Sequence, residues 1–245
     1  MRFRAIIFVL ITLLGTIFSI PIHAQEATPF RVYMAFEDGP TDAYTPQILD
    51  ILAQYNAKAT FFINGYQITG HEDILQRTIL EGHAIANHLW EEPGFYAGSP
   101  DEQIMQSYWR TEDAIRAALG DAVALYDAQP KLFRHPGGSI HKLPDIEGVN
   151  VITYNPSVDS DDCGWFQDST GNYDAGVLAN LLGDPVSEGG DRWNVFEYGD
   201  GVIISFHDIN RVTGRVLPIF LDELQRAGAT FHALPRPWDE PNTLP

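Results

Sequence analysis

The sequence predicts an α/β fold of about seven parallel strands that carries its active site at one end of the sheet. Short runs rich in β-branched and aromatic residues alternate with helical patterns, an order typical of parallel sheets. Several of these runs end in ionisable residues, among them Glu37-Asp38, His88, Arg134 and His207. Side chains at the carboxyl ends of strands form the active sites of α/β barrels and of open α/β sheets.

Strands and helices follow from local patterns. The predicted strands cover residues 32–36, 60–63, 84–86, 131–133, 151–154, 202–206 and 230–233. The segment Ser99-Pro100-Asp101-Glu102 provides an N-cap serine, a proline at the first helical position and a capping-box acid, and the helix should end before Gly120. Apolar spacing predicts two more helices near residues 48–55 and 215–227.

The chain divides into four segments. Residues 1–24 place two arginines before an apolar run and a short cleavage signal, which predicts a secretory signal peptide or, alternatively, an uncleaved anchor. Residues 25–29 form a leader, residues 30–234 one domain with a single core, and residues 235–245 an extended, proline-rich tail. Residues 184–200 predict a long loop whose aromatic side chains either contact a sugar or fix the loop to the barrel.

The net charge of the chain indicates which classes of partner it can bind. The formal charge is -18 at pH 7, and it becomes -20 once Arg2 and Arg4 leave with the signal. Because nucleic-acid binding depends on basic residues, we expect no nucleic-acid partner, whereas a neutral or weakly cationic glycan meets no such barrier. Cys163 is the single cysteine, so no intramolecular disulfide forms.

Five motifs carry the ionisable residues in a fixed order. They are Ala35-Phe36-Glu37-Asp38-Gly39-Pro40, Asn87-His88-Leu89-Trp90-Glu91-Glu92-Pro93, Arg134-His135-Pro136-Gly137-Gly138, Asp159-Ser160-Asp161-Asp162 with Trp165 displaced, and Ser205-Phe206-His207-Asp208. This series resembles the polysaccharide deacetylase family, the NodB-like carbohydrate esterases of family 4, over nearly the whole chain after the signal. The resemblance implies a distorted (β/α) barrel of the NodB-homology type that hydrolyses N-acetyl groups of a glycan.

The resemblance also implies a metal centre with a base beside it. Asp38 and His88 correspond to ligands of a divalent cation, for which the family implies zinc. Glu37 corresponds to the general base that takes a proton from water, and Arg134 should hold that base in its charged form.

A second group of residues corresponds to the acid and to the substrate contacts. His207 matches the general acid, and Asp159 would orient its imidazole and raise its pKa. Arg134 or backbone N–H groups near Gly137 and Gly138 would help to hold the oxyanion. Trp165 would form a wall of the site, or else belongs to the core.

Two residues depart from the family pattern where the chemistry takes place. Glu37 is one methylene longer than the family's aspartate, which moves its carboxylate by about 1.5 Å; either the backbone compensates or turnover is slow. Glu92 occupies the place of the family's second histidine ligand. Its carboxylate can bind a metal, or the neighbouring Glu91 binds in its place. The third alternative is that no metal binds. Two carboxylates would neutralise the ion and favour manganese or magnesium.

We therefore expect an exported enzyme, periplasmic, extracellular or anchored, that deacetylates N-acetylglucosamine units with a metal-polarised water, a carboxylate base and a histidine acid. Two rival hypotheses remain: a catalytically impaired relative that binds carbohydrate, and a hydrolase of small non-peptide amides. The sequence leaves the glycan and the oligomeric state open.

Overall fold

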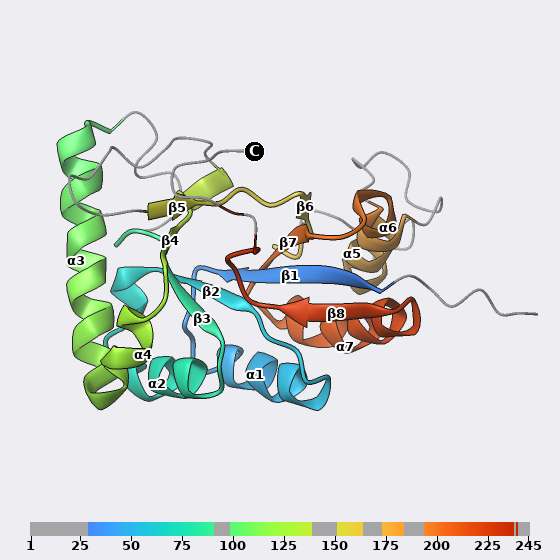
Figure 1. Cartoon of the computed structure of the whole chain (residues 1–245), viewed down its shortest axis with the longest axis horizontal. Coiled ribbons are helices and arrows are strands. Elements are labelled where there is room, and N and C mark those ends of the chain that lie inside the picture. The colour runs from blue at the N-terminus through green and yellow to red at the C-terminus, as the bar shows by residue number, and fades with distance from the viewer. Residues whose placement is uncertain are drawn as a thin grey trace, which may run out of the picture.

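Eight parallel strands form one sheet that curls into a partial barrel (Figure 1). The computed structural model describes residues 29–90, 99–138, 151–163, 173–183, 194–237 and 239. The strands are β1 (Phe30–Glu37), β2 (Thr60–Ile63), β3 (Ala84–Asn87), β4 (Lys131–Phe133), β5 (Val151–Thr153), β6 (Val158–Asp159), β7 (Val202–His207) and β8 (Ala229–His232). The α/β class and the distorted barrel are confirmed, and β6 is the additional strand.

The strand order is β5-β4-β3-β2-β1-β7-β6, and β8 pairs with the first half of β1. Within the described residues no ladder joins β5 to β6, so the barrel is open between these two strands. Because β2 and β7 flank the second half of β1, Glu37 lies opposite Phe62 on one side and His207 on the other. This register brings the carboxyl ends of three central strands to one level.

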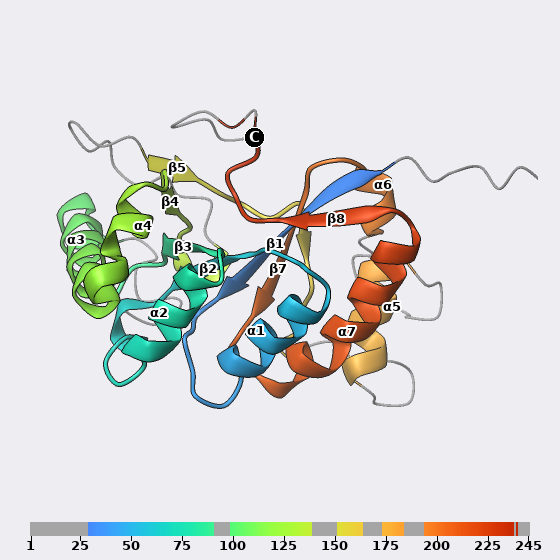
Figure 2. The ribbon, with the colours of Figure 1, turned by 60° about the horizontal axis from the view of Figure 1, so that its bottom comes forward.

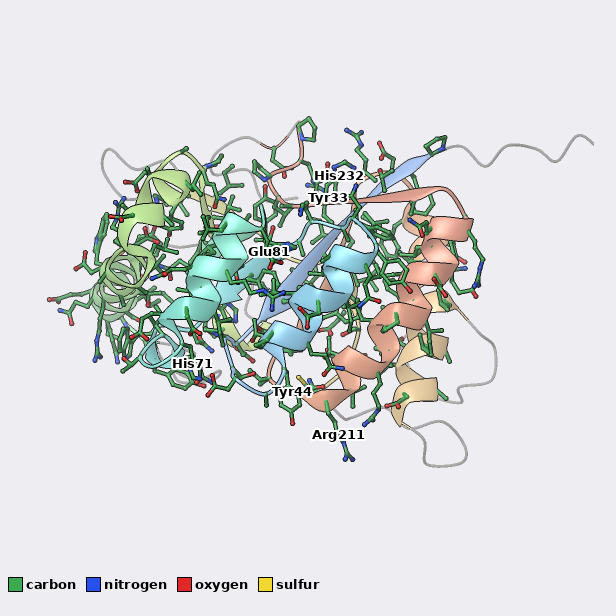
Figure 3. All side chains as sticks on the ribbon, turned by 90° about the horizontal axis from the view of Figure 1, so that it is seen from below. Tyr33, Tyr44, His71, Glu81, Arg211 and His232 are labelled. Atoms are coloured by element: carbon green, nitrogen blue, oxygen red, sulfur yellow. The ribbon has the colours of Figure 1, made fainter. Side chains whose placement is uncertain are left out.

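Helices cover the outer face of the sheet. They are α1 (Thr45–Gln54), α2 (Glu72–Leu80), α3 (Asp101–Leu119), α4 (Val123–Asp127), α5 (Tyr173–Leu182), α6 (Val195–Tyr198) and α7 (Arg211–Arg226), with short 3-10 helices at Gly65–Gln67, Gly120–Ala122 and Pro136–Gly138. Figure 2 shows α1, α2 and α7 along one face, with α3 and α5 at its flanks. Tyr44, just before α1, and Arg211, the first residue of α7, lie at the end of the sheet opposite Tyr33 and His232 (Figure 3).

Alternate residues of β1 face two different cores, so the strand is buried on both faces. On the helix side Phe36 stacks between Phe61 and Phe206, with ring centroids 5.1 and 5.7 Å away. Inside the barrel Ala35 packs with Tyr33 and other inner residues. Burying a phenylalanine contributes about 1.5–3 kcal/mol, so these aromatic contacts hold β1 firmly between its neighbours.

Several predicted boundaries differ from the observed ones. The N-cap of α3 is Pro100, one residue later than expected, and α7 begins at Arg211 because the Asn210 side chain accepts hydrogen bonds from its first turn. Part of the predicted loop 184–200 is helix α6, whose Phe196 and Tyr198 are exposed.

The end of the predicted domain and the start of the predicted tail are both fixed to the barrel by hydrogen bonds. The backbone N–H of Leu234 donates to the hydroxyl of Thr60 at the start of β2 (2.9 Å), and Arg236 donates to the carbonyl of Gly201 just before β7 (3.3 Å). Tyr154 donates its hydroxyl hydrogen to Asp239 (2.5 Å). The segment after β8 therefore covers the amino ends of two strands. Among the helices of the described ranges, none combines the length and the apolar character that a membrane span requires.

Because His83 is buried, the free energy of unfolding should depend on pH. Burial lowers the pKa of His83 to about 4, and its Nδ1 accepts the N–H of Ala59 (3.2 Å). The unfolded chain takes up this proton near pH 6.5 and the folded chain only near pH 4, so the free energy of unfolding should fall by up to about 3 kcal/mol as the pH drops through that window. Above pH 6.5 the contribution is fully present.

Denaturant titrations at pH 7.0 and 4.5 measure this effect. His83→Asn keeps an acceptor for Ala59 but has no titrating group, so it should lose less stability between these pH values than the natural protein. An equal loss in both proteins contradicts the prediction.

Candidate active site

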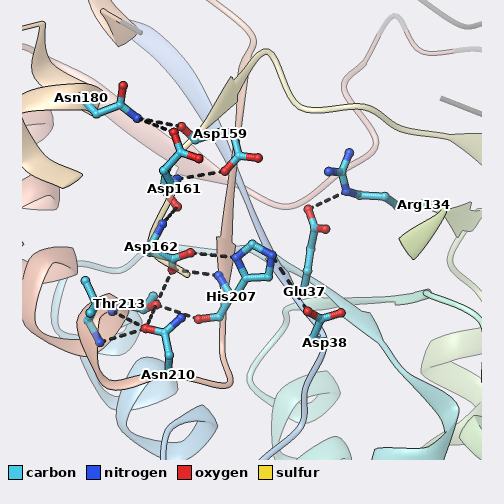
Figure 4. A network of polar contacts seen from close by, with 12 residues as sticks. Glu37, Asp38, Arg134, Asp159, Asp161, Asp162, Asn180, His207, Asn210 and Thr213 are labelled. Atoms are coloured by element: carbon cyan, nitrogen blue, oxygen red, sulfur yellow. Dashed lines mark hydrogen bonds and ion pairs between the residues drawn. The ribbon is translucent and has the colours of Figure 1, made fainter. Parts of the chain in front are cut away.

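Five ionisable side chains that the sequence singled out lie together at the carboxyl ends of the strands. Figure 4 shows four of them: Glu37, Asp38, Arg134 and His207. Glu37 and His207 are the last residues of β1 and β7, whereas Asp38, His88 and Arg134 directly follow β1, β3 and β4. Four of the five side chains are at most 8% exposed, whereas the His207 side chain is 17% exposed. His207 therefore presents the most accessible of the five groups.

Asp38 is held in an uncommon backbone conformation with its carboxylate toward the histidines. Its φ is 75°, the left-handed region that a non-glycine residue seldom adopts. Asn64, directly after β2, donates from Nδ2 to Oδ1 of Asp38 (3.0 Å). Burial raises the pKa of Asp38, but the contacts with His88, His207 and Asn64 lower it by more, so the net shift is downward.

His88 offers one ring nitrogen to the two carboxylates. Its Nδ1 lies 2.8 Å from the carbonyl oxygen of Arg134, which assigns the Nδ1 proton to that hydrogen bond. Its Nε2 lies 3.4 Å from Oδ1 of Asp38 and 3.7 Å from Oε2 of Glu37. Two carboxylate oxygens and a ring lone pair in a buried place are stable only with positive charge among them, which a proton or a divalent cation supplies. The residues present therefore fit a metal ion.

Glu37 is anchored by the arginine expected beside it. Nε of Arg134 lies 2.6 Å from Oε1 of Glu37, and both side chains are about 95% buried. One carboxylate oxygen is thus fixed in an ion pair, and Oε2 remains on the side of His88. The longer glutamate side chain is held in one place by this contact.

His207 is oriented by Asp162 and not by Asp159, which corrects the sequence-based expectation. Nδ1 of His207 lies 2.7 Å from Oδ1 of Asp162, a fully buried residue. Asp159 pairs with Ser205 in the β6–β7 ladder, two residues before His207, and its carboxylate accepts the N–H of Asp161 (2.9 Å). A left-handed turn at Asp161 then carries the chain up to the level of His207.

Further hydrogen bonds fix Asp162. Its Oδ2 accepts from the backbone N–H of His207 (2.9 Å) and from the hydroxyl of Thr213 in the first turn of α7. Burial lowers the pKa of His207, but the hydrogen bond to Asp162 and the charges of Asp162 and Glu37 outweigh it and place this pKa well above its usual value. The raised pKa favours the protonated imidazole, which is the form that a general acid requires.

Cys163 lies next to this pair. Asp162, Cys163 and His207 have potential ligand atoms within 4.8 Å of one another. However, both oxygens of Asp162 and Nδ1 of His207 are already hydrogen bonded. Cys163 is exposed, yet partial desolvation of its thiol raises the pKa, which disfavours the thiolate and the reactivity that comes with it.

The structure leaves some predicted site residues untested. Glu92 and Trp165 lie outside the described residues. Gly137, with a φ of 71°, and Gly138 lie in the 3-10 turn Pro136–Gly138, which begins two residues after Arg134. Their role stays a prediction.

Three residues at the site carry roles that the sequence did not reveal. Asn64 holds Asp38, Asp162 holds His207, and the buried Asp208 contacts the turn at Gly39. Burial and the charge of Asp38 raise the pKa of Asp208 to about 7, against the hydrogen bond from Thr45. Asn64 and Asp208 each follow a strand directly, which is the signal that identified the other site residues.

The described residues thus define an α/β barrel whose strand ends gather carboxylates, histidines and an arginine. The chain belongs to the polysaccharide deacetylase family, whose model matches residues 24–146. Peptidoglycan-N-acetylglucosamine deacetylase PgdA of Listeria monocytogenes serotype 1/2a is 28% identical over 86% of this chain and 40% of that protein. Chitooligosaccharide deacetylase of Bradyrhizobium sp. (strain ANU 289) is 28% identical over 84% of this chain and 89% of that protein.

Solved structures share the fold. Peptidoglycan deacetylase PdaC from Bacillus subtilis matches with a TM-score of 0.63 at 25% identity, over 84% of this chain and 88% of that one. A family 4 acetyl xylan esterase from Clostridium thermocellum, in complex with a cobalt ion, matches with a TM-score of 0.60 at 26% identity, over 83% and 87%. The described barrel is therefore the fold of these proteins.

Replacing each of the two aspartates of the fourth motif should affect the pKa of His207 differently. Asp162→Asn removes the charge beside Nδ1 and should lower the pKa of His207 toward its ordinary value. Asp159→Asn changes a carboxylate that does not contact the ring and should leave this pKa unchanged. NMR titration of the histidine ring signals measures both, and a shift in the Asp159 variant alone would restore the original assignment.

Proposed function

We propose that this protein is a metal-dependent hydrolase that removes acetyl groups from N-acetylated sugars of a glycan. The proposal rests on one observation: Glu37, Asp38, His88 and His207 converge at the strand ends, each with a fixed orientation. The family membership supports this reaction, and the relatives named for peptidoglycan and chitooligosaccharides support N-acetylglucosamine units as substrate. The acidic surface suits a substrate that becomes cationic on deacetylation.

Asp38 and His88 would hold the divalent cation, with Asn64 orienting the carboxylate and the Arg134 carbonyl orienting the imidazole. When bound, such a cation lowers the pKa of a coordinated water from 15.7 to about 7 and polarises the carbonyl oxygen of the amide. Hydrogen-bonded outer partners of this kind typically change metal affinity by about 10–100-fold. The centre therefore depends on residues beyond the ligands themselves.

Glu37 and His207 would move the protons of the reaction. Oε1 of Glu37 is occupied by Arg134, so Oε2 accepts the proton of the attacking water. Nδ1 of His207 is occupied by Asp162, so Nε2 donates a proton to the departing nitrogen. The N–H groups near Gly137 and Gly138, together with Arg134, would stabilise the oxyanion.

The identity of the ion depends on Glu92. With Glu92 as third ligand, two carboxylates and one imidazole neutralise a divalent cation, which favours manganese or magnesium over the zinc that the family implies. Export through the predicted signal peptide to the cell envelope or beyond would bring the enzyme to its glycan.

Two substitutions separate metal binding from proton transfer. Glu37→Gln should lower kcat for acetate release by about 10²–10⁴-fold because it removes the base, and metal affinity should change little. Asp38→Asn should weaken metal binding by more than about tenfold, since it changes a ligand and not only an outer partner. Acetate release from N-acetylglucosamine oligomers and metal content by elemental analysis give the two readouts. Full activity of the Glu37→Gln protein contradicts the proposed base.

Glu92→His tests the ligand set. The natural protein should bind manganese or magnesium comparatively well, and the histidine variant should shift the preference toward zinc. Parallel acetate-release assays with the three ions measure this preference, with Glu91→His as the matched control. If only the Glu91 variant changes the preference, Glu91 is the ligand; if the natural protein is inactive with every ion and Glu92→His is active, the natural chain is an impaired relative.

A further inference from the structure

Asp208 is a buried carboxylate at the site with no part in the proposed proton transfers. It follows β7 directly and is 1% exposed. Its backbone N–H donates to the carbonyl of Glu37 (3.2 Å), which continues the β1–β7 pairing one residue beyond the strands. Its Oδ2 accepts a hydrogen bond from the hydroxyl of Thr45 (2.7 Å), at the start of α1.

The side chain of Asp208 occupies the space that a side chain at position 39 would need. A Cβ on Gly39 would lie 2.1 and 2.3 Å from the two carboxylate oxygens of Asp208, closer than real Cβ atoms come to other atoms. The φ of Gly39 is not in the left-handed region, so its backbone conformation does not require glycine. Glycine is needed here because the carboxylate lies against it.

This contact fixes the turn that carries the metal ligand Asp38. The turn is strained, since Asp38 has a φ of 75°, and such conformations persist only when their surroundings hold them. Asn64 holds it from β2, with its backbone N–H donating to the carbonyl of Gly39 (3.2 Å). On the β7 side, Thr41 donates its hydroxyl hydrogen to the carbonyl of Asp208 (2.9 Å), and the N–H of Thr41 donates to the hydroxyl of Thr45 (2.8 Å).

We propose that Asp208 is a positioning residue that clamps the Asp38-Gly39 turn and thereby sets the affinity of the Asp38 and His88 centre for its divalent cation. This inference rests on the proposed metal centre and assigns Asp208 no contact with the ion. The clamp acts through shape and hydrogen bonding, because the carboxylate fills the space beside Gly39 and accepts from Thr45. Its neutral isostere, asparagine, should therefore retain most of the function.

The dissociation constants of Zn²⁺ and Co²⁺, measured by competition with a chromophoric chelator, test the proposal without any enzymatic assay. Asp208→Ala should weaken binding by about 10–100-fold, the range of outer-shell partners. Asp208→Asn should stay within a few-fold of the natural protein. An Asp208→Ala protein that binds both ions as tightly as the natural protein overturns the proposal, and an asparagine variant as weak as the alanine variant shows that charge, not position, is the cause.

A double-mutant cycle with Gly39→Ala gives the sharper result. The added methyl group should expel the Asp208 carboxylate and weaken metal binding about as much as Asp208→Ala does. In the double variant the methyl group meets no carboxylate, so the two losses should not add. Additive losses contradict the clamp.

Two controls complete the experiment. Thr45→Val removes the donor to Oδ2 of Asp208 together with the acceptor of the Thr41 N–H, both of which belong to the clamp, and should weaken binding by several-fold. This variant keeps the proposal testable if Asp208→Ala does not fold, and unchanged affinity in Thr45→Val then overturns it. Thermal unfolding of each apoprotein separates a loss of affinity from a loss of fold. If the natural protein binds no ion at all, the proposed function fails, whereas normal binding with an unaffected Asp208→Ala variant refutes the clamp alone.

Discussion

The parallel register between β1 and β7 is the constraint on which the site depends. It sets Glu37 opposite His207 and continues one residue further through the N–H of Asp208. A slip of one residue would turn every side chain of β1 to the opposite face, exchanging the two cores and removing both acids from the histidines. The aromatic stack around Phe36 resists such a slip because it buries large side chains that fit only in this register.

The sequence predicted the position of the site well and its hydrogen bonding less well. Glu37 and His207 end their strands, and His88 and Arg134 directly follow theirs. The carboxyl ends of parallel strands meet at one edge of the sheet whatever the details of their loops. The partner of His207 could not be chosen in this way, because a turn of three residues decides whether Asp159 or Asp162 reaches the ring. That decision depends on the left-handed backbone at Asp161, which has no clear sequence signal in a non-glycine residue.

Other differences have equally local causes. β6 has two residues, too few for any periodicity, and its existence depends on pairing with β7. The start of α7 depends on Asn210, a capping residue that stands several residues before the apolar pattern becomes regular. The buried carboxylate of Asp208 occupies the space beside Gly39 that a side chain there would fill. The sequence alone does not show which distant side chain lies against a given glycine.

The segment after β8 has a consequence for the molecule as a whole. Leu234 belongs to the inner core and donates its own N–H to Thr60 at the start of β2, and Arg236 donates to Gly201 just before β7. Residues 234–236 thus close the barrel at the end opposite to the candidate active site. A chain cut just after β8 would expose apolar lining to water and invite aggregation, even though every group that performs chemistry would still be present.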